Sequence, residues 1–563
     1  MKKIFWILLC LLLVGAAAGA AFFCLPGWNL TERDGKELVL LYDDRYTFDQ
    51  EIREIRGQEV TSFQTGTDSP DTGILEIQGG DRIHVRAAGC GSVEVALADG
   101  TAVKVTVKPA PISLILLAGQ SNCEGCINDR NAIDEYKKQW IRNPEGSAYC
   151  TYGVTEEMYE SVAWYTDVDN VGPLTLDNLD RFLPASLTDN SLNDRYNRTD
   201  SLTSSPDAAG KGGIDSALAF RWRQLTGEKV WIINASRHGS EISVWEPGSE
   251  HELALFEKAV RLYTGAEKIL SEEIGAGHYT LAHKGVYWCH GETDSFLKTF
   301  SSKYQASFDR IRQGFMEALS GKDIENMEKE VEFFGIIMPR ASLFYPNKGA
   351  DYVLTGARMS QYYMAISQDY PDVFMASYLG DLWTDDQSVE TYFAEKYGTE
   401  GNYSSFWPMR SRTIPLPTTM DEVHGSIHYT QIGYNELGID AAENICYALG
   451  YSRPEKRKVD SVSFITADGT RVRNGETVGM QEKVRNVLAV RVSPAYMTKA
   501  VEIRTSANLI FNETGVRMLY GEEGTVRVRQ GSLKEKITFR REEPVLEEEE
   551  VAGLDLKSLG KAP

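Results

Sequence analysis

Between residues 112 and 451 the chain alternates short apolar runs with longer amphipathic segments. The apolar runs have the length and composition of strands buried on both faces: Leu114–Ala118, Val230–Asn234, Gly285–Trp288, Val331–Ile337 and Val373–Ala376. The amphipathic segments have the length of helices: Ser216–Leu225, Glu252–Ser271, Phe308–Leu319 and Leu354–Gln368. Because strands that alternate with helices form parallel sheets, this region is predicted to be an α/β domain of three layers, with helices on both faces of a parallel sheet.

Two parts of this region lack the alternation. Residues 128–213 and 379–419 are polar or aromatic and show little periodicity. We expect both to be long loops over the edge of the sheet where a ligand binds, because such loops usually carry specificity.

The flanking regions, residues 30–109 and 458–541, are predicted to be all-β. Each closes with alternating apolar runs around a turn, at Asp99-Gly100 in the first and at Gln530-Gly531-Ser532 in the second. These hairpin patterns resemble immunoglobulin-like modules. Pro109 and Pro111 are expected to mark a linker into the α/β domain, and residues 542–563 an acidic, disordered tail.

Charge and the N-terminus bound the compartment and the partners. The chain of 563 residues has a net charge of −22, which excludes nucleic acid and anionic membrane surfaces as electrostatic partners. Lys2 and Lys3 precede an apolar run from Ile4 to Leu25, a pattern typical of a signal peptide and also long enough for an uncleaved anchor. We therefore expect residues 1–27 to direct export to an extracellular or cell-surface location, with or without an N-terminal membrane tether.

The cysteines do not indicate a disulfide scaffold. Eight are present, and Cys10 and Cys24 lie in the export segment. Cys123 and Cys126 form a C-x-x-C pattern, but no second one exists to complete a zinc site. Buried thiols or one local disulfide are expected.

Polar residues gather where predicted strands end. The first strand runs into Gly119-Gln120-Ser121-Asn122, which places a hydroxyl between two amides at the edge where open α/β sheets bind ligands. Three later segments add further candidates: Ile232–Ser240 with His238 and Gly239, Val286–Asp294 with His290, Glu292 and Asp294, and Asp421–Gly438 with His424 and His428.

These residue types fit acyl transfer, which needs a nucleophile, a base, an orienting carboxylate and donors for an oxyanion. Ser121 offers the nucleophile, and a histidine of the last segment offers the base. The backbone amides of Ser121 and Gly239, with a side-chain donor from His290, are candidates for the oxyanion hole. His238, beside the glycine, is a candidate to face the substrate.

In order and spacing, the four blocks resemble those of the SGNH-hydrolase superfamily, and more closely its sialate O-acetylesterase and acetylxylan esterase branch, carbohydrate esterase family six. The resemblance covers residues 112–450 and includes Ile242 and Trp245 after the glycine turn. It implies a serine-dependent acetylesterase that uses no cofactor or metal and acts on acetylated sugars of the sialic acid or xylan type. The site residues it implies are Ser121, Gln120, Asn122, Gly239, His290, Glu292 and a terminal Asp–His pair.

The sequence departs from this pattern in three places. Cys123 stands where methionine is usual, and His290 where glutamine is usual. The last block offers two histidines: Asp421 precedes His424 by three residues, whereas His428 is followed by a glycine at the usual distance. We favour His428 as the base, with Asp421 as the orienting carboxylate and Glu292 in reserve. His424 is the alternative base.

Two other classes of function remain open on the sequence. In a metalloenzyme, His424 and His428 would share one face of a helix, but Gly425 interrupts a helix there and no H-E-x-x-H motif occurs. A catalytically inactive carbohydrate-binding protein on the same scaffold would use the aromatic loops instead. Acetate release that is lost on Ser121→Ala separates an enzyme from such a binding protein.

Overall fold

A computed structural model describes residues 37–42, 45–48, 60–64, 73–78, 83–97, 102–124, 162–166, 214–251, 253–340, 354–398, 415–424, 428–451, 458–466, 470–481 and 488–542. Within these ranges, no helix is both long and apolar enough to cross a bilayer. The predicted export segment, residues 1–27, lies outside the described residues, as does the acidic tail except for Glu542, which ends a strand and was wrongly assigned to the tail.

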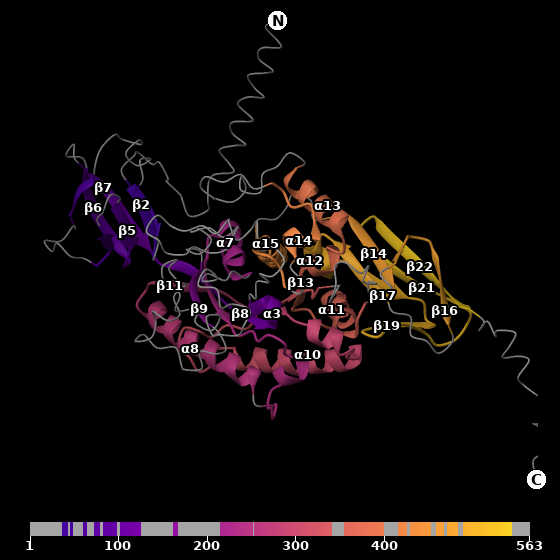
Figure 1. Ribbon diagram of the computed structural model, residues 1–563. Helices are drawn as coiled ribbons and strands as arrows, with labels where there is room; N and C mark the ends of the chain where they lie inside the picture. The colour runs from indigo at the N-terminus through magenta and orange to yellow at the C-terminus, as the bar shows by residue number, and fades with distance from the viewer. Residues whose placement is uncertain are drawn as a thin grey trace, which may run out of the picture.

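A parallel sheet forms the centre of the molecule (Figure 1). It has six strands in the order β13-β12-β11-β8-β10-β9. All the apolar runs predicted to be strands are found in it. The strand bounds are β8 Ala110–Gly119, β9 Val162–Thr166, β10 Lys229–Asn234, β11 Tyr279–Cys289, β12 Phe333–Ile337 and β13 Val373–Ser377.

Successive side chains of the central strands enter two separate cores. In β8, Leu114 and Leu116 belong to one core, whereas Ile115 and Leu117 belong to the other, and all four are fully buried. This is the arrangement expected for strands that are apolar throughout, because neither face meets water. The three-layer α/β prediction is confirmed.

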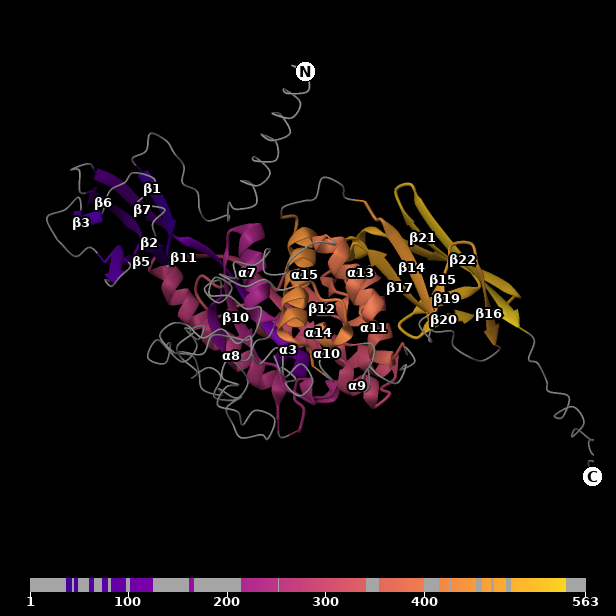
Figure 2. The same ribbon diagram turned by 45° about the horizontal axis from the view of Figure 1, so that its top comes forward.

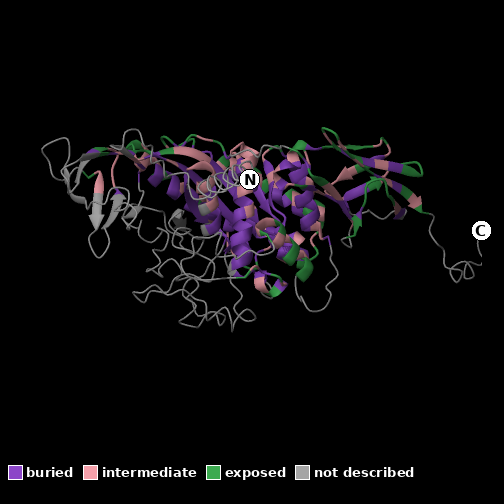
Figure 3. Cartoon of the chain, turned by 90° about the horizontal axis from the view of Figure 1, so that it is seen from above, coloured by how far each residue is buried: buried purple, intermediate pink, exposed green. Residues whose placement is uncertain are grey.

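Helices cover both faces (Figures 1 and 2). The core that contains Leu114 also takes residues from α8 Leu255–Gly275, α10 Ser301–Ala318 and α11 Gly356–Ile366. The core that contains Ile115 takes residues from α7 Asp215–Thr226, α13 Asp386–Tyr397 and α15 Gln431–Leu449. Figure 3 shows that buried residues are concentrated in this central part.

Regular structure occurs in both regions that were predicted to be loops. Strand β9, within residues 128–213, pairs in parallel with β10 at the edge of the sheet. Helices α12 Leu379–Leu382 and α13 lie within residues 379–419. The loop prediction is wrong for these segments. Trp383, Val389 and Phe393 explain why residues 379–397 are helical. They are buried in the core that contains Ile115, and this tertiary packing stabilises helices that their weak local pattern does not predict.

The N-terminal region forms two small sheets, with the orders β1-β7-β6-β3 and β2-β5-β4. The predicted hairpin is present as the antiparallel pair β6 and β7. Only Pro109 separates β7 from β8, and Pro111 lies inside β8, so the expected two-proline linker is a single residue. The bounds are β1 Glu37–Leu41, β2 Arg45–Phe48, β3 Val60–Gln64, β4 Leu75–Gln78, β5 Ile83–Ala87, β6 Gly91–Leu97 and β7 Ala102–Lys108.

The C-terminal region is also all-β, in sheets ordered β15-β14-β17, β16-β22-β21-β18 and β19-β20. The second predicted hairpin is the antiparallel pair β21 and β22. The strand bounds of this region are β14 Ser461–Thr466, β15 Arg471–Val472, β16 Thr477–Gln481, β17 Leu488–Ser493, β18 Glu502–Thr505, β19 Leu509–Asn512, β20 Gly515–Met518, β21 Glu523–Gln530 and β22 Leu533–Glu542. The assignment of either flanking region as immunoglobulin-like stays a prediction.

The C-terminal region is joined to the α/β domain by charge as well as by packing. Arg491 of β17 pairs with the buried carboxylate of Asp381 in α12. The ammonium of Lys499 donates to the carbonyl oxygen of Met364 at 2.9 Å and to that of Ser367 at 2.5 Å, at the end of α11. These contacts anchor the β region on the side of the sheet that carries β13.

Candidate active site

The order of the strands makes the end of β8 the natural place for a site. Its neighbours are β10 on one side and β11 on the other, so the chain passes from one side of β8 to the other. Loops that leave in opposite directions open a crevice at the carboxyl end of such a strand. Ser121, the first residue of the short helix α3 Ser121–Glu124, lies two residues beyond the end of β8 and is 6% exposed.

The glycine before this serine is required by a close contact. Gly119 has φ +154°, and a Cβ there would lie 2.0 Å from the carbonyl oxygen of Cys289 in β11. The same oxygen accepts a hydrogen bond from the amide of Gln120 at 3.0 Å. The turn that carries Ser121 is therefore fastened to β11, and a larger residue at position 119 would break it.

Gln120 and Asn122, the two amides that flank Ser121, hold it to the third block. Oε1 of Gln120 accepts from the amides of Gly291 at 3.3 Å and Thr293 at 3.2 Å, at the start of α9 Glu292–Phe296. Nδ2 of Asn122 donates to Oε1 of Glu292 at 2.8 Å. Burial raises the pKa of Glu292, and the bond from Asn122 lowers it.

The second block forms a tight turn beside the serine. The amide of Arg237 donates to the carbonyl oxygen of Gly119 at 2.9 Å, and the amide of Ser240 to that of Arg237 at 3.4 Å. Gly239 adopts φ +67°, a left-handed conformation that glycine takes without strain. Within the described part of the chain, the amides of Ser121 and Gly239 donate no hydrogen bond.

His290 is fully buried, and protein groups occupy both of its ring nitrogens. Nε2 lies 3.1 Å from the carbonyl oxygen of Ser240 and so donates to it, and Nδ1 lies 3.2 Å from the hydroxyl of Tyr304. Burial lowers the pKa of this imidazole. In this arrangement no ring N–H of His290 is left for an oxyanion. The hydrogen bond from Nε2 of His290 instead holds the carbonyl of Ser240, the residue after Gly239.

Asp294 and Trp245 complete the support of the turn. Oδ2 of Asp294 accepts from the amide of Ile242 at 2.9 Å, and Nε1 of Trp245 donates to Oγ of Ser240 at 3.0 Å. The first three blocks are thus joined by hydrogen bonds although they lie far apart in the sequence.

The two candidate bases have different surroundings. His424 is 1% exposed, lies against Trp383 and Tyr429 with ring centroids 5.6 and 4.4 Å away, and has no hydrogen-bond partner for either ring nitrogen among the described residues. Burial, and then the charge of Arg340, lower the pKa of His424 well below its usual value.

His428 is partly exposed. The pKa of His428 is lowered to about 4, with burial as the largest cause. The negative charge of Glu124 opposes this shift, whereas the charges of His238 and Arg340 add to it. Glu124 belongs to the same helical turn as Ser121, and His238 precedes Gly239. His428 therefore lies within electrostatic reach of the helix that carries Ser121 and of the glycine turn.

Asp421, the carboxylate predicted to orient the base, lies in α14 Met420–Val423 and is exposed. Among the described residues no hydrogen bond joins its carboxylate to either histidine. Glu292, held in reserve for the same role, is instead engaged by Asn122.

Two charged residues of this site were not found from the sequence. Arg340, which is 2% exposed, comes three residues after the end of β12, and Glu124 is 6% exposed. A charged residue directly after a buried strand is the signal that would have pointed to Arg340. Glu124 gave a weaker signal, its place three residues after Ser121, one helical turn further on.

The described residues also bear on the state of the cysteines and on metal binding. Cys123 is a buried free thiol, and Cys126, the other cysteine of the C-x-x-C pattern, lies outside the described residues. No group of three histidine, cysteine, aspartate or glutamate side chains suited to a metal ion is found in the described ranges.

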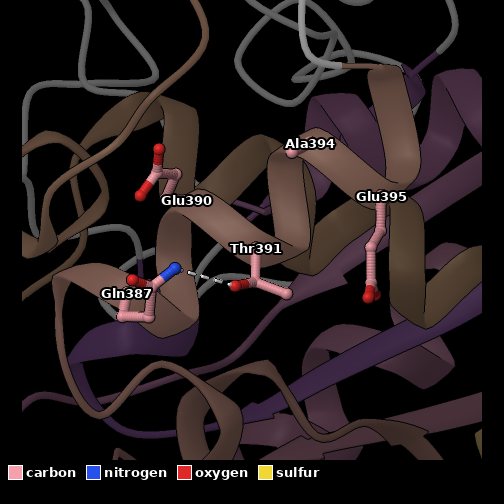
Figure 4. Close-up of a pocket in the computed structure, with 5 residues that line it drawn as sticks. All are labelled: Gln387, Glu390, Thr391, Ala394 and Glu395. Atoms are coloured by element: carbon pink, nitrogen blue, oxygen red, sulfur yellow. Dashed lines mark hydrogen bonds between the residues drawn. The ribbon is translucent and has the colours of Figure 1, made fainter.

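A separate hollow of about 360 Å³ lies on α13 (Figure 4). All its lining residues belong to that one helix: Gln387, Glu390, Thr391, Ala394 and Glu395. It contains none of the residues that surround Ser121.

Comparison with known proteins gives similar structures and no sequence match. No family model and no curated protein matches the chain. An Arabidopsis thaliana protein of known structure is 16% identical, with 61% of this chain and 99% of that chain covered and a TM-score of 0.32. A carbohydrate acetylesterase from Xanthomonas citri is 16% identical, with 78% and 83% covered and a TM-score of 0.28. The carbohydrate acetylesterase Est24 from Sinorhizobium meliloti is 11% identical, with 60% and 98% covered and a TM-score of 0.23. At these TM-scores the similarity does not support any role for the residues around Ser121.

Proposed function

We propose that this protein is a serine-dependent O-acetylesterase that acts on acetylated carbohydrate. One observation carries the proposal: the amides of Ser121 and Gly239 donate to no described residue, at the place where the hydroxyl of Ser121 follows the central strand. Such amides are the donors that an acyl-transfer site needs for its oxyanion.

In the proposed reaction, His428 takes the proton of Ser121 as Oγ attacks the acetyl carbonyl carbon. The carbonyl oxygen becomes an oxyanion that accepts from the amides of Ser121 and Gly239. The bond to the sugar oxygen then breaks, the sugar leaves with the proton from His428, and acetyl-Ser121 remains. Water that loses its proton to His428 attacks the acetyl group, and acetate leaves as Ser121 regains its proton.

The remaining residues support these two groups. Asp421 is proposed to orient His428 when the substrate is bound. Gln120 and Asn122 keep the serine turn attached to α9. A pKa of about 4 keeps the imidazole of His428 neutral at neutral pH, the form that accepts a proton. No cofactor or metal enters this scheme.

The substrate class rests on the four sequence blocks, whose resemblance implies acetylated sugars of the sialic acid or xylan type. The location is proposed on the same basis of sequence: residues 1–27 direct export, and the protein acts outside the cell or at its surface.

The test is acetate release by the full chain. We expect the wild type to cleave a chromogenic acetyl ester with a burst of the leaving group, and Ser121→Ala to abolish it. A panel of acetylated xylan, acetylated sialoglycan and simple acetylated sugars then identifies the glycan. Binding of a glycan without any acetate release would reject the esterase and support a carbohydrate-binding protein on this scaffold.

A further inference from the structure

Glu124 is a buried carboxylate in the helix of the nucleophile, yet the proposed reaction gives it no part. Its Oε2 accepts from the backbone amide of His238 at 2.6 Å and lies 3.2 Å from Nδ1 of the same residue. Both contacts join α3 to the residue that directly precedes Gly239. A carboxylate that accepts two hydrogen bonds from one residue restricts both its backbone and its side chain.

We propose that Glu124 is a positioning residue that holds the Gly239 turn against the helix of Ser121, so that both oxyanion donors keep a fixed separation. This inference rests on the proposed esterase reaction. An oxyanion hole is effective only when its donors are in place before the charge develops, because reorganisation during the reaction has a cost.

The turn is held at several points, and Glu124 supplies the one next to the glycine. The amide of Arg237 is bonded to the carbonyl of Gly119, and the carbonyl of Ser240 accepts from His290. These contacts fix the two ends of the turn. The bond from the amide of His238 to Glu124 acts on the peptide unit between these ends, whose carbonyl oxygen, that of Arg237, accepts from the amide of Ser240 at 3.4 Å and from its hydroxyl at 2.8 Å.

The place of Glu124 also suits the charge changes of the reaction. His428 becomes positively charged as it takes the proton of Ser121, and the charge of Glu124 acts on His428. A nearby negative charge stabilises an imidazolium. Glu124 therefore supports the protonated base at the moment when the Gly239 amide supports the oxyanion.

The experiment compares Glu124→Ala, Glu124→Gln and His238→Ala in the full chain by steady-state kinetics. We expect kcat to fall by roughly 10²-fold in Glu124→Ala, as when one oxyanion donor is lost, with KM changed less than about threefold. Glu124→Gln, whose amide oxygen still accepts one bond, should lose about tenfold in kcat. His238→Ala should lose least, because the backbone amide that Glu124 binds remains.

Glu257→Gln is the matched control. Glu257 is an exposed carboxylate that also accepts from a backbone amide, that of Gly248 at 2.6 Å, and none of its contacts with described residues involves the site. Its kinetics should match those of the wild type.

A readout independent of activity is hydrogen exchange of the peptide that contains residues 236–242. Exchange should be faster in Glu124→Ala than in the wild type and unchanged in Glu257→Gln. If the wild type cleaves no acetyl ester, the proposed function fails, and the exchange result still decides whether Glu124 holds the turn.

Three results would overturn the proposal. The first is a kcat of Glu124→Ala within twofold of the wild type, and the second is unchanged exchange at residues 236–242. The third is a loss on His238→Ala as large as that on His428→Ala, which would make His238 the base with Glu124 as its carboxylate.

Discussion

The two halves of the candidate site are built differently. The half that carries Ser121, Gly239 and His290 follows directly from three adjacent parallel strands, and hydrogen bonds link its segments to one another. The half that carries His424 and His428 lies between the short helix α14 and the long helix α15. His424 is anchored by aromatic packing, whereas His428 is partly exposed and is influenced by charges of the first half.

The two candidate bases differ in spacing and in surroundings. Spacing from Asp421 favours His424, but a fully buried ring with no polar partner among the described residues resembles a packed aromatic more than a proton carrier. Exposure and the electrostatic influence of Glu124 favour His428.

The largest effect is expected from His428→Ala. Loss of the base should lower kcat/KM for a chromogenic acetyl ester by at least about 10⁴-fold, as loss of a triad member does. The matched variant His424→Phe keeps an aromatic ring between Trp383 and Tyr429 and should stay within about tenfold of the wild type. Both variants need wild-type melting curves. The reverse order of losses would assign the base to His424.

A smaller effect is expected from Asp421→Asn. Neutralising a buried triad carboxylate costs roughly 10⁴-fold in kcat, but Asp421 is exposed, so we expect a loss of about 10- to 10³-fold. Steady-state kinetics measure it. A rate equal to that of the wild type would remove Asp421 from the proposed mechanism and leave Glu124 as the negative charge that acts on His428.

The pH profile should show the environment of His428. The base works as the neutral imidazole, so activity is present above its pKa and is lost as the pH falls through about 4, not through the usual value near 6.5. Three groups supply the charges that act on it: Glu124, His238 and Arg340. Glu124→Gln removes the charge that raises the pKa of His428, so the acidic limb of this variant's pH profile should move to lower pH. A wild-type midpoint near 6.5 would contradict the lowered pKa of His428.

The smallest effect is expected from Glu292→Gln, on the stability of the half of the site that carries Ser121, Gly239 and His290. Burial raises the pKa of Glu292 above its ordinary value of 4.5, so the folded state holds this proton more tightly than the unfolded state. The stability that this contributes is present below pH 4.5 and is lost as the pH rises through the folded-state pKa. Glu292→Gln still accepts from Asn122 and should therefore gain melting temperature relative to the wild type between pH 4 and pH 7. A difference that shrinks over this range would contradict the sign.

The strands and the main helices were predictable because their patterns are local. The run Leu114–Ala118 is apolar at every position and is buried on both faces. Strand β9 was missed because an edge strand is specified by its pairing with β10 more than by its own composition. Trp383 and Phe393 were assigned to a loop because the core that buries them comes from distant helices.

For the site, the sequence by itself determined the candidate groups and the strand end at which they lie, because a buried parallel strand delivers the residues that follow it to one edge of the sheet. Tertiary structure decided how those groups are used. It assigned the ring nitrogens of His290 to Ser240 and Tyr304, and brought Glu124 to His238 across 114 residues of sequence. Hydrogen bonds depend on distances of a few tenths of an ångström between segments far apart in the chain, and no local pattern encodes them.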